Sequence, residues 1–374
     1  MKLERKAKNI IAVGGGKGGV GKSIFSIAIA SSLALMGKRV VLADFDLGSA
    51  NLHTYLGVNS KRSLSDFFHK KAASLEAIME DTSIRNLKLI SGSEFMPGAA
   101  NPAYWLKLKM MRHVKAIDAD FVIIDLGAGV HINVLDLFGI ADKGIIVTTP
   151  EPGAVINAYS FIKGALFRKI EVVFRQHPLI SPLIKDLMKN NASEGSFTLE
   201  WLNEKIKATD VEISPLIKEI ADWFNPCLVA NMMPDKGQSI LIDNLKGLCR
   251  ENLDLDLVQI GTIPDTKVVS RFLLNIPAIF EAPEGHAFKS AVDNIRGLLL
   301  RESSGEESVG ESEKIRNDFD DEDIRCIMTV VDGADSSILD SRSKKLWKLR
   351  LFFKPQVVVN FLRSKGIRHD VFFD

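Results

Sequence analysis

Glycines, two lysines and a serine follow one another closely near the start of the chain, in the run GGGKGGVGKS at residues 14–23. Its last eight residues match G-x-x-x-x-G-K-[ST], the pattern of a loop that binds phosphates. Glycines let backbone N–H groups turn toward an anion, because no Cβ blocks its approach. Lys22 can reach the outer phosphates, and the Ser23 hydroxyl can bind Mg²⁺. The expected binding residues are Gly16, Lys17, Gly18, Gly19, Val20, Gly21, Lys22, Ser23 and Ile24.

The segments on either side of this loop support the same interpretation. Residues 9–13 form an apolar run that predicts a buried strand, and residues 24–36 show a helical pattern that ends before Gly37. Strand, glycine-rich loop and helix in this order are the context that a phosphate-binding loop requires. The positive end of the helix dipole adds to the attraction for an anion. The alternative is a turn without a ligand, which the complete pattern disfavours.

Carboxylates follow two further predicted strands. The run 38–43 ends in Asp44 and Asp46, and the apolar run 121–124 ends in Asp125. Ligands bind at the carboxyl ends of strands in open α/β sheets, and alternate residues of an extended chain share a face. One carboxylate of the first pair can hold a metal-bound water while the other orients the attacking water. A turn with a helix cap would also explain that pair. Asp125 would reach the metal shell from a central strand that is buried on both faces.

The form K-G-G-V-G-K-S, in which Lys17 is a second lysine, resembles the deviant Walker-A loop of the MinD/ParA family of ATPases. The runs DFDLGSANL and LGAGV, at residues 44–52 and 126–130, are similar to switch I and switch II of the MinD branch. The resemblance implies that ATP and Mg²⁺ are bound, that Lys17 reaches the partner's nucleotide in a dimer, and that Asp46 positions the attacking water. It further implies catalytic roles for Lys17, Lys22 and Asp46, metal roles for Ser23, Asp44 and Asp125, and base contacts for Asn231, Pro264 and Asp265.

The run TTPEP at residues 148–152 resembles the flagellar number regulators of this family, the FlhG group. That group carries Asp where this chain has Asn157, and the segment D-Q-A-x-x-L-R of typical members is not seen. The resemblance implies an ATP-dependent dimerising switch that hydrolyses ATP slowly, is stimulated by a protein partner, and controls the placement or number of a cellular structure. The alternatives are a DNA-partitioning ATPase of the ParA type and a MinD-like division-site regulator at the membrane.

Composition narrows these classes. The 374 residues carry a net charge of +1, which gives no global signal for nucleic acid or an acidic membrane. Cys227, Cys249 and Cys326 lie far apart and no C-x-x-C occurs, so an iron–sulfur or zinc role has no ligand set. Sparse cysteines suit a reducing cytoplasm, and the absence of about eighteen consecutive apolar residues predicts no membrane-spanning helix. A cytoplasmic protein, with peripheral membrane contact as one option, is expected.

The predicted fold is α/β: a mostly parallel, doubly wound sheet with helices on both faces, in a domain over residues 1–301. A helical insertion is expected at about 166–225, beginning with a short helix at 166–169. Residues 302–323 hold ten acidic and two basic residues, a composition typical of a solvated linker. Residues 324–374 would form a small α/β or amphipathic element. Within it, Ser341–Lys354 carries six basic residues among apolar ones, so it packs on protein, lies on anionic membrane or binds a protein partner.

Overall fold

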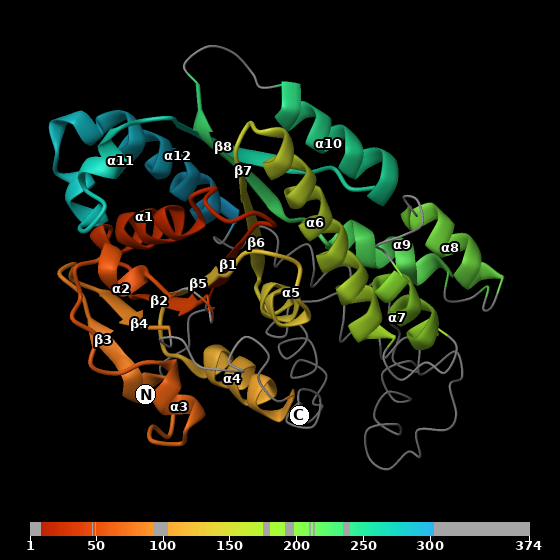
Figure 1. Ribbon diagram of the computed structural model, residues 1–374, viewed down its shortest axis with the longest axis horizontal. Coiled ribbons are helices and arrows are strands. Elements are labelled where there is room, and N and C mark those ends of the chain that lie inside the picture. The colour runs from red at the N-terminus through yellow and green to blue at the C-terminus, as the bar shows by residue number, and fades with distance from the viewer. Residues whose placement is uncertain are drawn as a thin grey trace, which may run out of the picture. The chain divides into compact units, whose positions relative to one another are not determined.

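Eight strands form one sheet in the computed structural model (Figure 1). The structure describes residues 9–46, 48, 50–92, 104–174, 180–190, 198–208, 211, 214–234 and 240–302. The strand order is β3-β4-β2-β5-β1-β6-β7-β8. The strands are β1 (Asn9–Gly14), β2 (Val40–Phe45), β3 (Met79–Asp81), β4 (Leu87–Ile90), β5 (Phe121–Leu126), β6 (Lys143–Thr148), β7 (Cys227–Met233) and β8 (Val258–Pro264).

All neighbouring strands run parallel except the short β3, which pairs antiparallel with β4 at one edge. The first strand, β1, lies between β5 and β6. From β1 the chain passes to β2 on one side, and from β5 it passes to β6 on the other side. The direction of winding therefore reverses beside β1, which is the place where open parallel sheets bind ligands.

Helices cover both faces of the sheet. Right-handed crossovers in opposite directions put α1, between β1 and β2, and α5, between β5 and β6, on opposite faces. Figure 1 shows α1 and α12 on one side of the central strands and α4 and α5 on the other. The helices are α1 (Lys22–Leu35), α2 (Leu52–Tyr55), α3 (Leu64–Phe68), α4 (Tyr104–Ala116), α5 (Ile132–Gly139), α6 (Pro152–Val173), α7 (Ile180–Asn190), α8 (Leu199–Lys207), α9 (Ser214–Trp223), α10 (Ile240–Leu253), α11 (Val268–Arg271) and α12 (His286–Glu302).

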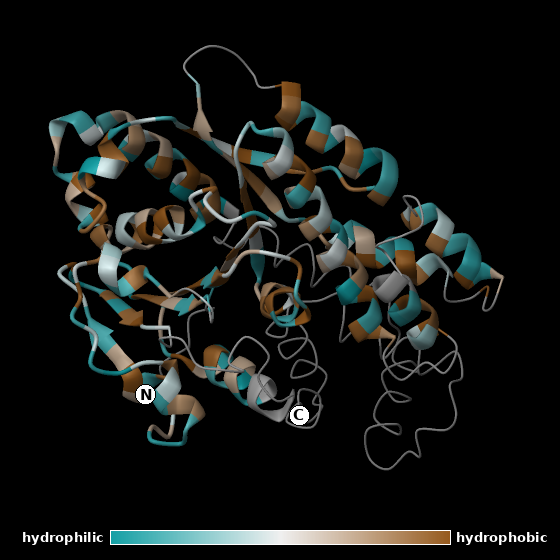
Figure 2. Cartoon of the chain, viewed as in Figure 1, coloured by the Kyte–Doolittle hydropathy of each residue, from teal (hydrophilic) through white to brown (hydrophobic). Residues whose placement is uncertain are grey.

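The core lies between the central strands and these helices. Every residue of β2 and β5 is buried, as continuous apolar runs covered on both faces should be. Figure 2 shows hydrophobic residues gathered on the central strands, whereas helices such as α10 and α12 alternate hydrophobic and hydrophilic positions. The predicted doubly wound, mostly parallel sheet is confirmed.

Three helices, α7, α8 and α9, stand between α6 and β7, within the region where the sequence predicts an insertion. The short helix predicted at 166–169 is instead part of α6, which runs unbroken for 22 residues. Buried apolar side chains recur along its whole length, so packing holds it straight through this stretch. None of the helices in the described ranges is both long and apolar enough to cross a membrane. The predicted acidic linker and C-terminal element fall at 303–374, outside the described residues.

Candidate functional site

A glycine-rich loop joins β1 to α1 at the point where the winding of the sheet reverses. Gly19 and Gly21 have φ angles of 80° and 90°, which side-chain-bearing residues rarely adopt. Gly21 is the N-cap of α1, and its carbonyl accepts the first helical bond from the N–H of Phe25 at 2.9 Å. The loop therefore delivers the positive end of a 14-residue helix to the edge of the sheet.

The base of this loop is tightly packed. A Cβ added at Gly16 would lie 2.0 Å from the carbonyl oxygen of Asn157 in α6, so only glycine fits there. The Gly16 carbonyl accepts a hydrogen bond from the N–H of Gly129 at 3.1 Å. These contacts tie the loop both to α6 and to the segment that follows β5. By contrast, an added Cβ at Gly19 would meet no atom of the described residues within 4 Å, so the outer side of the loop is open to a ligand.

Lys22, the first residue of α1, places a cation under the loop. Its side chain is buried, and its ammonium donates to the Lys17 carbonyl at 3.1 Å. Burial lowers the pKa of Lys22, and the nearby carboxylates of Asp125 and Asp46 oppose that effect. A buried lysine tethered to the loop backbone, beside open glycines, fits a phosphate chain as a ligand.

Asp125, in β5, lies beside this lysine. It is 1% exposed, and its Oδ1 accepts a hydrogen bond from the Ser26 hydroxyl of α1 at 2.8 Å. Ser23, one turn earlier on the same helix, also acts on this carboxylate and lowers its pKa. Burial raises the pKa of Asp125 to about 6, although the hydroxyls of Ser23 and Ser26 and the charge of Lys22 lower it. A lysine and a serine from the first turn of α1 thus lie beside a buried carboxylate of β5.

Asp44 stands next to Asp125 in the sheet, since these two residues are register partners on β2 and β5. Its Oδ1 accepts the N–H of Asp46 at 3.1 Å, and its Oδ2 accepts those of Asn51 and Leu52 at 3.0 and 3.1 Å. Burial raises the pKa of Asp44 to about 8, with a further contribution from the charge of Asp125, against the effect of the backbone donors. These hydrogen bonds all come from backbone, the geometry of a cap, and the metal role stays a prediction.

Asp46 is more accessible than the other two carboxylates. Its Oδ1 accepts the N–H of Gly48 at 3.2 Å. A Cβ added at Gly127 would come within 3.0 Å of the same oxygen, so the segment after β5 lies directly against Asp46. The predicted switch segments after β2 and β5 are thereby brought together, with Asp46 at their contact.

Lys17 points away from the buried cluster. Its ammonium forms an ion pair with Glu151, the N-cap residue of α6, at 2.7 Å. The two side chains are 39% and 60% exposed, so the pair lies at the surface. The predicted role of Lys17 across a dimer interface is not tested by the structure, which holds one chain.

The three residues predicted to contact the base also come together. Asn231 in β7 is buried and donates its side-chain amide to the Val20 carbonyl of the loop at 2.8 Å. Pro264 of β8 pairs with Met233, and the N–H of Asp265 donates to the Met233 carbonyl at 2.8 Å. The end of β7 therefore contacts the loop and the end of β8 is bonded to β7, while a contact with adenine stays a prediction.

The structure adds three residues that sequence reasoning did not assign to the site. Ser26 orients Asp125, Glu151 pairs with Lys17, and Asn157 packs on Gly16. Ser26 carries a detectable signal, because it lies one turn after Ser23 on the same helix face. The other two depend on where α6 docks, and no local pattern predicts that.

The number of carboxylates limits whether this site can bind a metal ion without oxygens from a second ligand. Within the described ranges, no group of three or more His, Cys, Asp or Glu side chains could hold a metal ion. Mg²⁺ commonly binds one or two carboxylates together with phosphate oxygens and waters. Ser23 and Asp125 fit such a partial set, provided that a phosphate ligand supplies the remaining oxygens.

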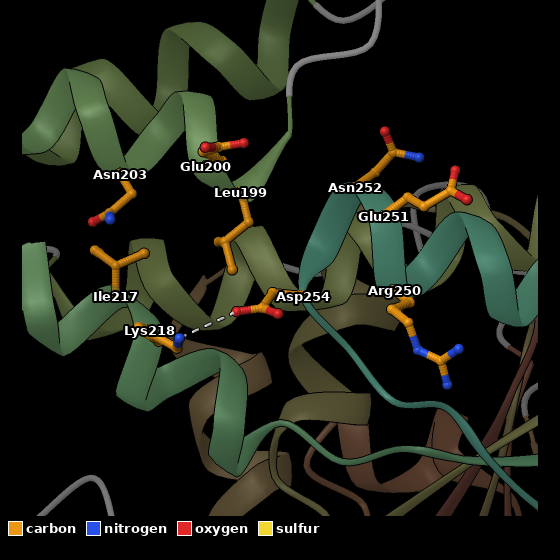
Figure 3. A pocket seen from close by; sticks show the side chains of 9 residues that line it. All are labelled: Leu199, Glu200, Asn203, Ile217, Lys218, Arg250, Glu251, Asn252 and Asp254. Atoms are coloured by element: carbon orange, nitrogen blue, oxygen red, sulfur yellow. Dashed lines mark ion pairs between the residues drawn. The ribbon is translucent and has the colours of Figure 1, made fainter.

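A pocket among the described residues lies elsewhere (Figure 3), with a volume of about 320 Å³. It is formed by α8, α9 and the end of α10. Its walls carry charges of both signs, and Lys218 pairs with Asp254 at 3.8 Å across it. The lining residues are Leu199, Glu200, Asn203, Ile217, Lys218, Arg250, Glu251, Asn252 and Asp254. None of them belongs to the phosphate-loop cluster, so the pocket is separate from it.

Comparisons with known proteins agree with this geometry. A ParA family model, described as NUBPL iron-transfer P-loop NTPase, matches residues 6–174. The antiactivator FleN of Pseudomonas aeruginosa is 33% identical over 164 residues, which are 41% of this chain and 55% of FleN. The septum site-determining protein MinD of Bacillus subtilis is 32% identical over 183 residues, 48% of this chain and 67% of MinD. The chain thus spans about half the length of FleN.

Solved structures show the same fold. MinD of Pyrococcus horikoshii, solved in complex with Mg-ADP, matches with a TM-score of 0.53 at 18% identity. The match covers 80% of this chain and 98% of that one. The conclusion rests on the shared fold, on the phosphate loop and on the sequence identity to MinD over two thirds of the length of MinD. The chain belongs to the MinD/ParA family of P-loop NTPases.

Proposed function

We propose that this chain is an ATP-dependent switch that binds Mg-ATP, dimerises in that state and reopens on hydrolysis. It would control the placement or number of a cellular structure; the name of MinD, a septum site-determining protein, says of that relative that it determines a site. Hydrolysis would be slow and stimulated by a protein partner. Differential affinity of the partner for the dimer and the monomer would transmit the nucleotide state.

The observation that carries the proposal is the buried pair of Lys22 and Asp125, with Ser23 beside them, beneath an open glycine loop. Lys22 is held by the Lys17 carbonyl and lies near Asp125, so its position is fixed before any ligand arrives. Preorganised charge of this kind stabilises developing negative charge without the cost of reorganisation. A loop that only turned the chain would not need a buried lysine at its base.

Each residue then has a defined part. Backbone N–H groups from Gly16 to Ile24, with Lys22, would hold the phosphates, and Ser23 and Asp125 would hold Mg²⁺. When bound, the metal neutralises charge on the outer phosphates. Asp46, accessible and in contact with the segment after β5, would orient the attacking water.

Lys17 would complete the site of a second copy. Its present partner, Glu151, is a surface residue, and exposed ion pairs contribute about 0–1 kcal/mol. Lys17 can therefore leave Glu151 at little cost when a more strongly negative triphosphate comes within reach. That small cost supports a lysine that exchanges partners between monomer and dimer.

The alternative functions receive less support. Iron transfer, which the description of the family model names, would need paired cysteines to bind the iron. The sequence has three cysteines, far apart, and Cys227 and Cys249 are buried. DNA partitioning would require a basic surface, and the net charge of +1 does not favour one. Membrane attachment through Ser341–Lys354 concerns residues outside those the structure describes, and vesicle sedimentation with and without this segment would test it.

Calorimetry and light scattering test the proposal together. The unaltered chain should bind ATP with Mg²⁺ and then double its mass. Lys22→Ala should lose nucleotide binding, whereas Asp46→Ala should retain ATP and accumulate as dimer. Lys88→Ala, which removes an exposed lysine paired with Asp81, serves as the control and should behave as the unaltered chain does. Equal dimerisation of the Lys22 and Asp46 variants would reject the proposal.

A further inference from the structure

The carboxylate of Asp44 is bonded differently from that of Asp125. Asp125 is held by side-chain hydroxyls from α1. Asp44 accepts N–H groups of Asp46, Asn51 and Leu52, and so binds the backbone of its own connection. Both are buried at the ends of adjacent strands, yet only one is turned to the helix that carries the phosphate loop.

These backbone bonds join Asp44, in β2, to Asp46 and to the start of α2. Asn51, the N-cap residue of α2, makes no side-chain capping bond. Oδ2 of Asp44 instead accepts the first two N–H groups of that turn, while Oδ1 accepts the N–H of Asp46. A buried carboxylate that takes three backbone donors on its two oxygens holds those three donors close to the end of β2.

The neighbouring strand leaves space for this arrangement. Gly92 follows β4, and a Cβ added there would lie 2.4 Å from the Cβ of Ala50 and 3.1 Å from Cγ of Asp44. Asp46 has its carboxylate against Gly127. The position of Asp46 is thus set on one side by Asp44 and on the other by the segment after β5.

We propose that Asp44 is a positioning residue: a latch that holds the backbone at Asp46, Asn51 and Leu52, and not a ligand of the metal. The inference rests on the proposed function, because it assigns Asp44 a part in presenting Asp46 for hydrolysis. It replaces the metal role that the sequence predicts for Asp44, and it leaves Ser23 and Asp125 as the protein's metal-binding groups.

Two measurements on Asp44→Asn separate a latch from a metal ligand. The first is amide hydrogen exchange at Asp46, Asn51 and Leu52 without nucleotide, which should speed up by at least about tenfold, because the amide offers one oxygen acceptor where the carboxyl group offers two. The second is the ratio of ADP affinities with and without Mg²⁺. That ratio should change less than about twofold in this variant. In Asp125→Asn it should fall toward one.

Hydrolysis gives a third readout. Asp44→Asn should lower kcat with KM unchanged, because Asp46 is displaced while the phosphates are still held. Asp66→Asn is a matched control, since Asp66 accepts the N–H of Ser63 in the capping box of α3, away from the loop. It should speed exchange at Ser63 only, with kcat and the magnesium ratio unaltered.

Gly92→Ala keeps every ionisable group and tests the latch from its other side, should Asp44→Asn fold poorly. Its Cβ should push on Ala50 and Asp44 and speed exchange at the same amides, with the magnesium ratio preserved. The latch is overturned if those amides exchange at the original rate in Asp44→Asn, or if that variant loses the magnesium ratio as Asp125→Asn does. If the unaltered chain bound no Mg-ADP, the proposed function would be rejected. The hydrogen-exchange measurement would still test whether Asp44 holds the backbone at Asp46, Asn51 and Leu52.

Discussion

Two regions of this protein bury several charges, and they do so in opposite ways. At the phosphate loop, Lys22 lies near the carboxylates of Asp125 and Asp46, and its ammonium is bonded to a backbone carbonyl. Between α5 and α6, Arg168 bonds both oxygens of Asp136, at 2.6 and 3.1 Å, and also pairs with Glu171. In the first region a hydroxyl bonds Asp125 and backbone N–H groups bond Asp44, while in the second a guanidinium pairs with its carboxylates directly.

The difference separates a binding site from a structural network. Direct bidentate pairing uses the donors of Arg168 and both acceptors of Asp136, so little is left for a ligand. At the loop, the raised pKa values of Asp44 and Asp125 report carboxylates that burial penalises. Carboxylates whose ionised form is penalised by burial in the folded state are candidates for a binding site. Magnesium bound together with a phosphate would stabilise that ionised form.

The largest effect on stability should come from the structural network. Arg168→Ala would leave two buried carboxylates without their guanidinium and should cost about 3–5 kcal/mol in the free energy of unfolding. Denaturant unfolding measures it. Arg39→Ala is the matched control, because Arg39 also pairs with two carboxylates, Asp118 and Asp120, but is 54% exposed. It should cost less than about 1 kcal/mol, and equal losses in both variants would contradict the comparison.

The nucleotide-free protein should lose stability as the pH rises from about 5 to 8.5. Folded-state pKa values of about 6 for Asp125 and about 8 for Asp44 exceed the ordinary 3.8. The folded state therefore holds extra protons below these values and gives up that advantage as the pH rises through them. Asp125 alone should contribute about 3 kcal/mol at most, and Asp125→Asn should flatten the profile. Thermal unfolding across this range checks the slope, and a rise in stability with pH would contradict its sign.

A smaller effect is expected where Asp125 meets α1. Ser26→Ala removes the hydroxyl that bonds Oδ1, and should weaken magnesium-dependent nucleotide binding by about tenfold, or about 1.4 kcal/mol. Calorimetric titration at several Mg²⁺ concentrations measures the loss. Ser31→Ala is the control on the same helix: this serine is also fully buried, and its hydroxyl has no hydrogen-bond partner among the described residues. If both variants bind equally, Ser26 does not orient Asp125.

The smallest effect should come from the surface pair at the edge of the site. Glu151→Gln removes the partner of Lys17 and should change the free energy of unfolding by less than about 1 kcal/mol. Freed from this pair, Lys17 should favour the dimer slightly, so the ATP concentration at half dimerisation should fall by up to about fivefold. Light scattering during an ATP titration measures it. A large loss of monomer stability would show that the pair is structural.

Local sequence patterns were sufficient to predict the structure of features that lie in one contiguous segment. The loop from Gly16 to Ser23 needs only its own glycines and the strand and helix that flank it, so its sequence predicts its conformation. Asp125 was predicted for a similar reason: an apolar run ending in a carboxylate is typical of a buried parallel strand. The short helix expected at 166–169 was wrong, because packing along α6 extends through it.

Contacts between segments that lie far apart in the chain could not be predicted from the sequence. Glu151 meets Lys17, and Asn157 meets Gly16, because α6 docks against the loop from more than a hundred residues away. For Asp44 the sequence left two roles open, a metal residue or a cap. The structure brings the N–H groups of Asp46, Asn51 and Leu52 to its oxygens.

The sequence by itself determined the phosphate loop, the order of strands and helices that present it, and the family. Periodicity, glycine placement and short motifs act over a few residues, and these features need nothing more. Only the tertiary structure decided how the buried charges are shared: Lys22 with a loop carbonyl, Asp125 with α1, and Asp44 with backbone. Hydrogen bonds depend on distances of a few tenths of an ångström, and those are set by how whole helices and strands pack.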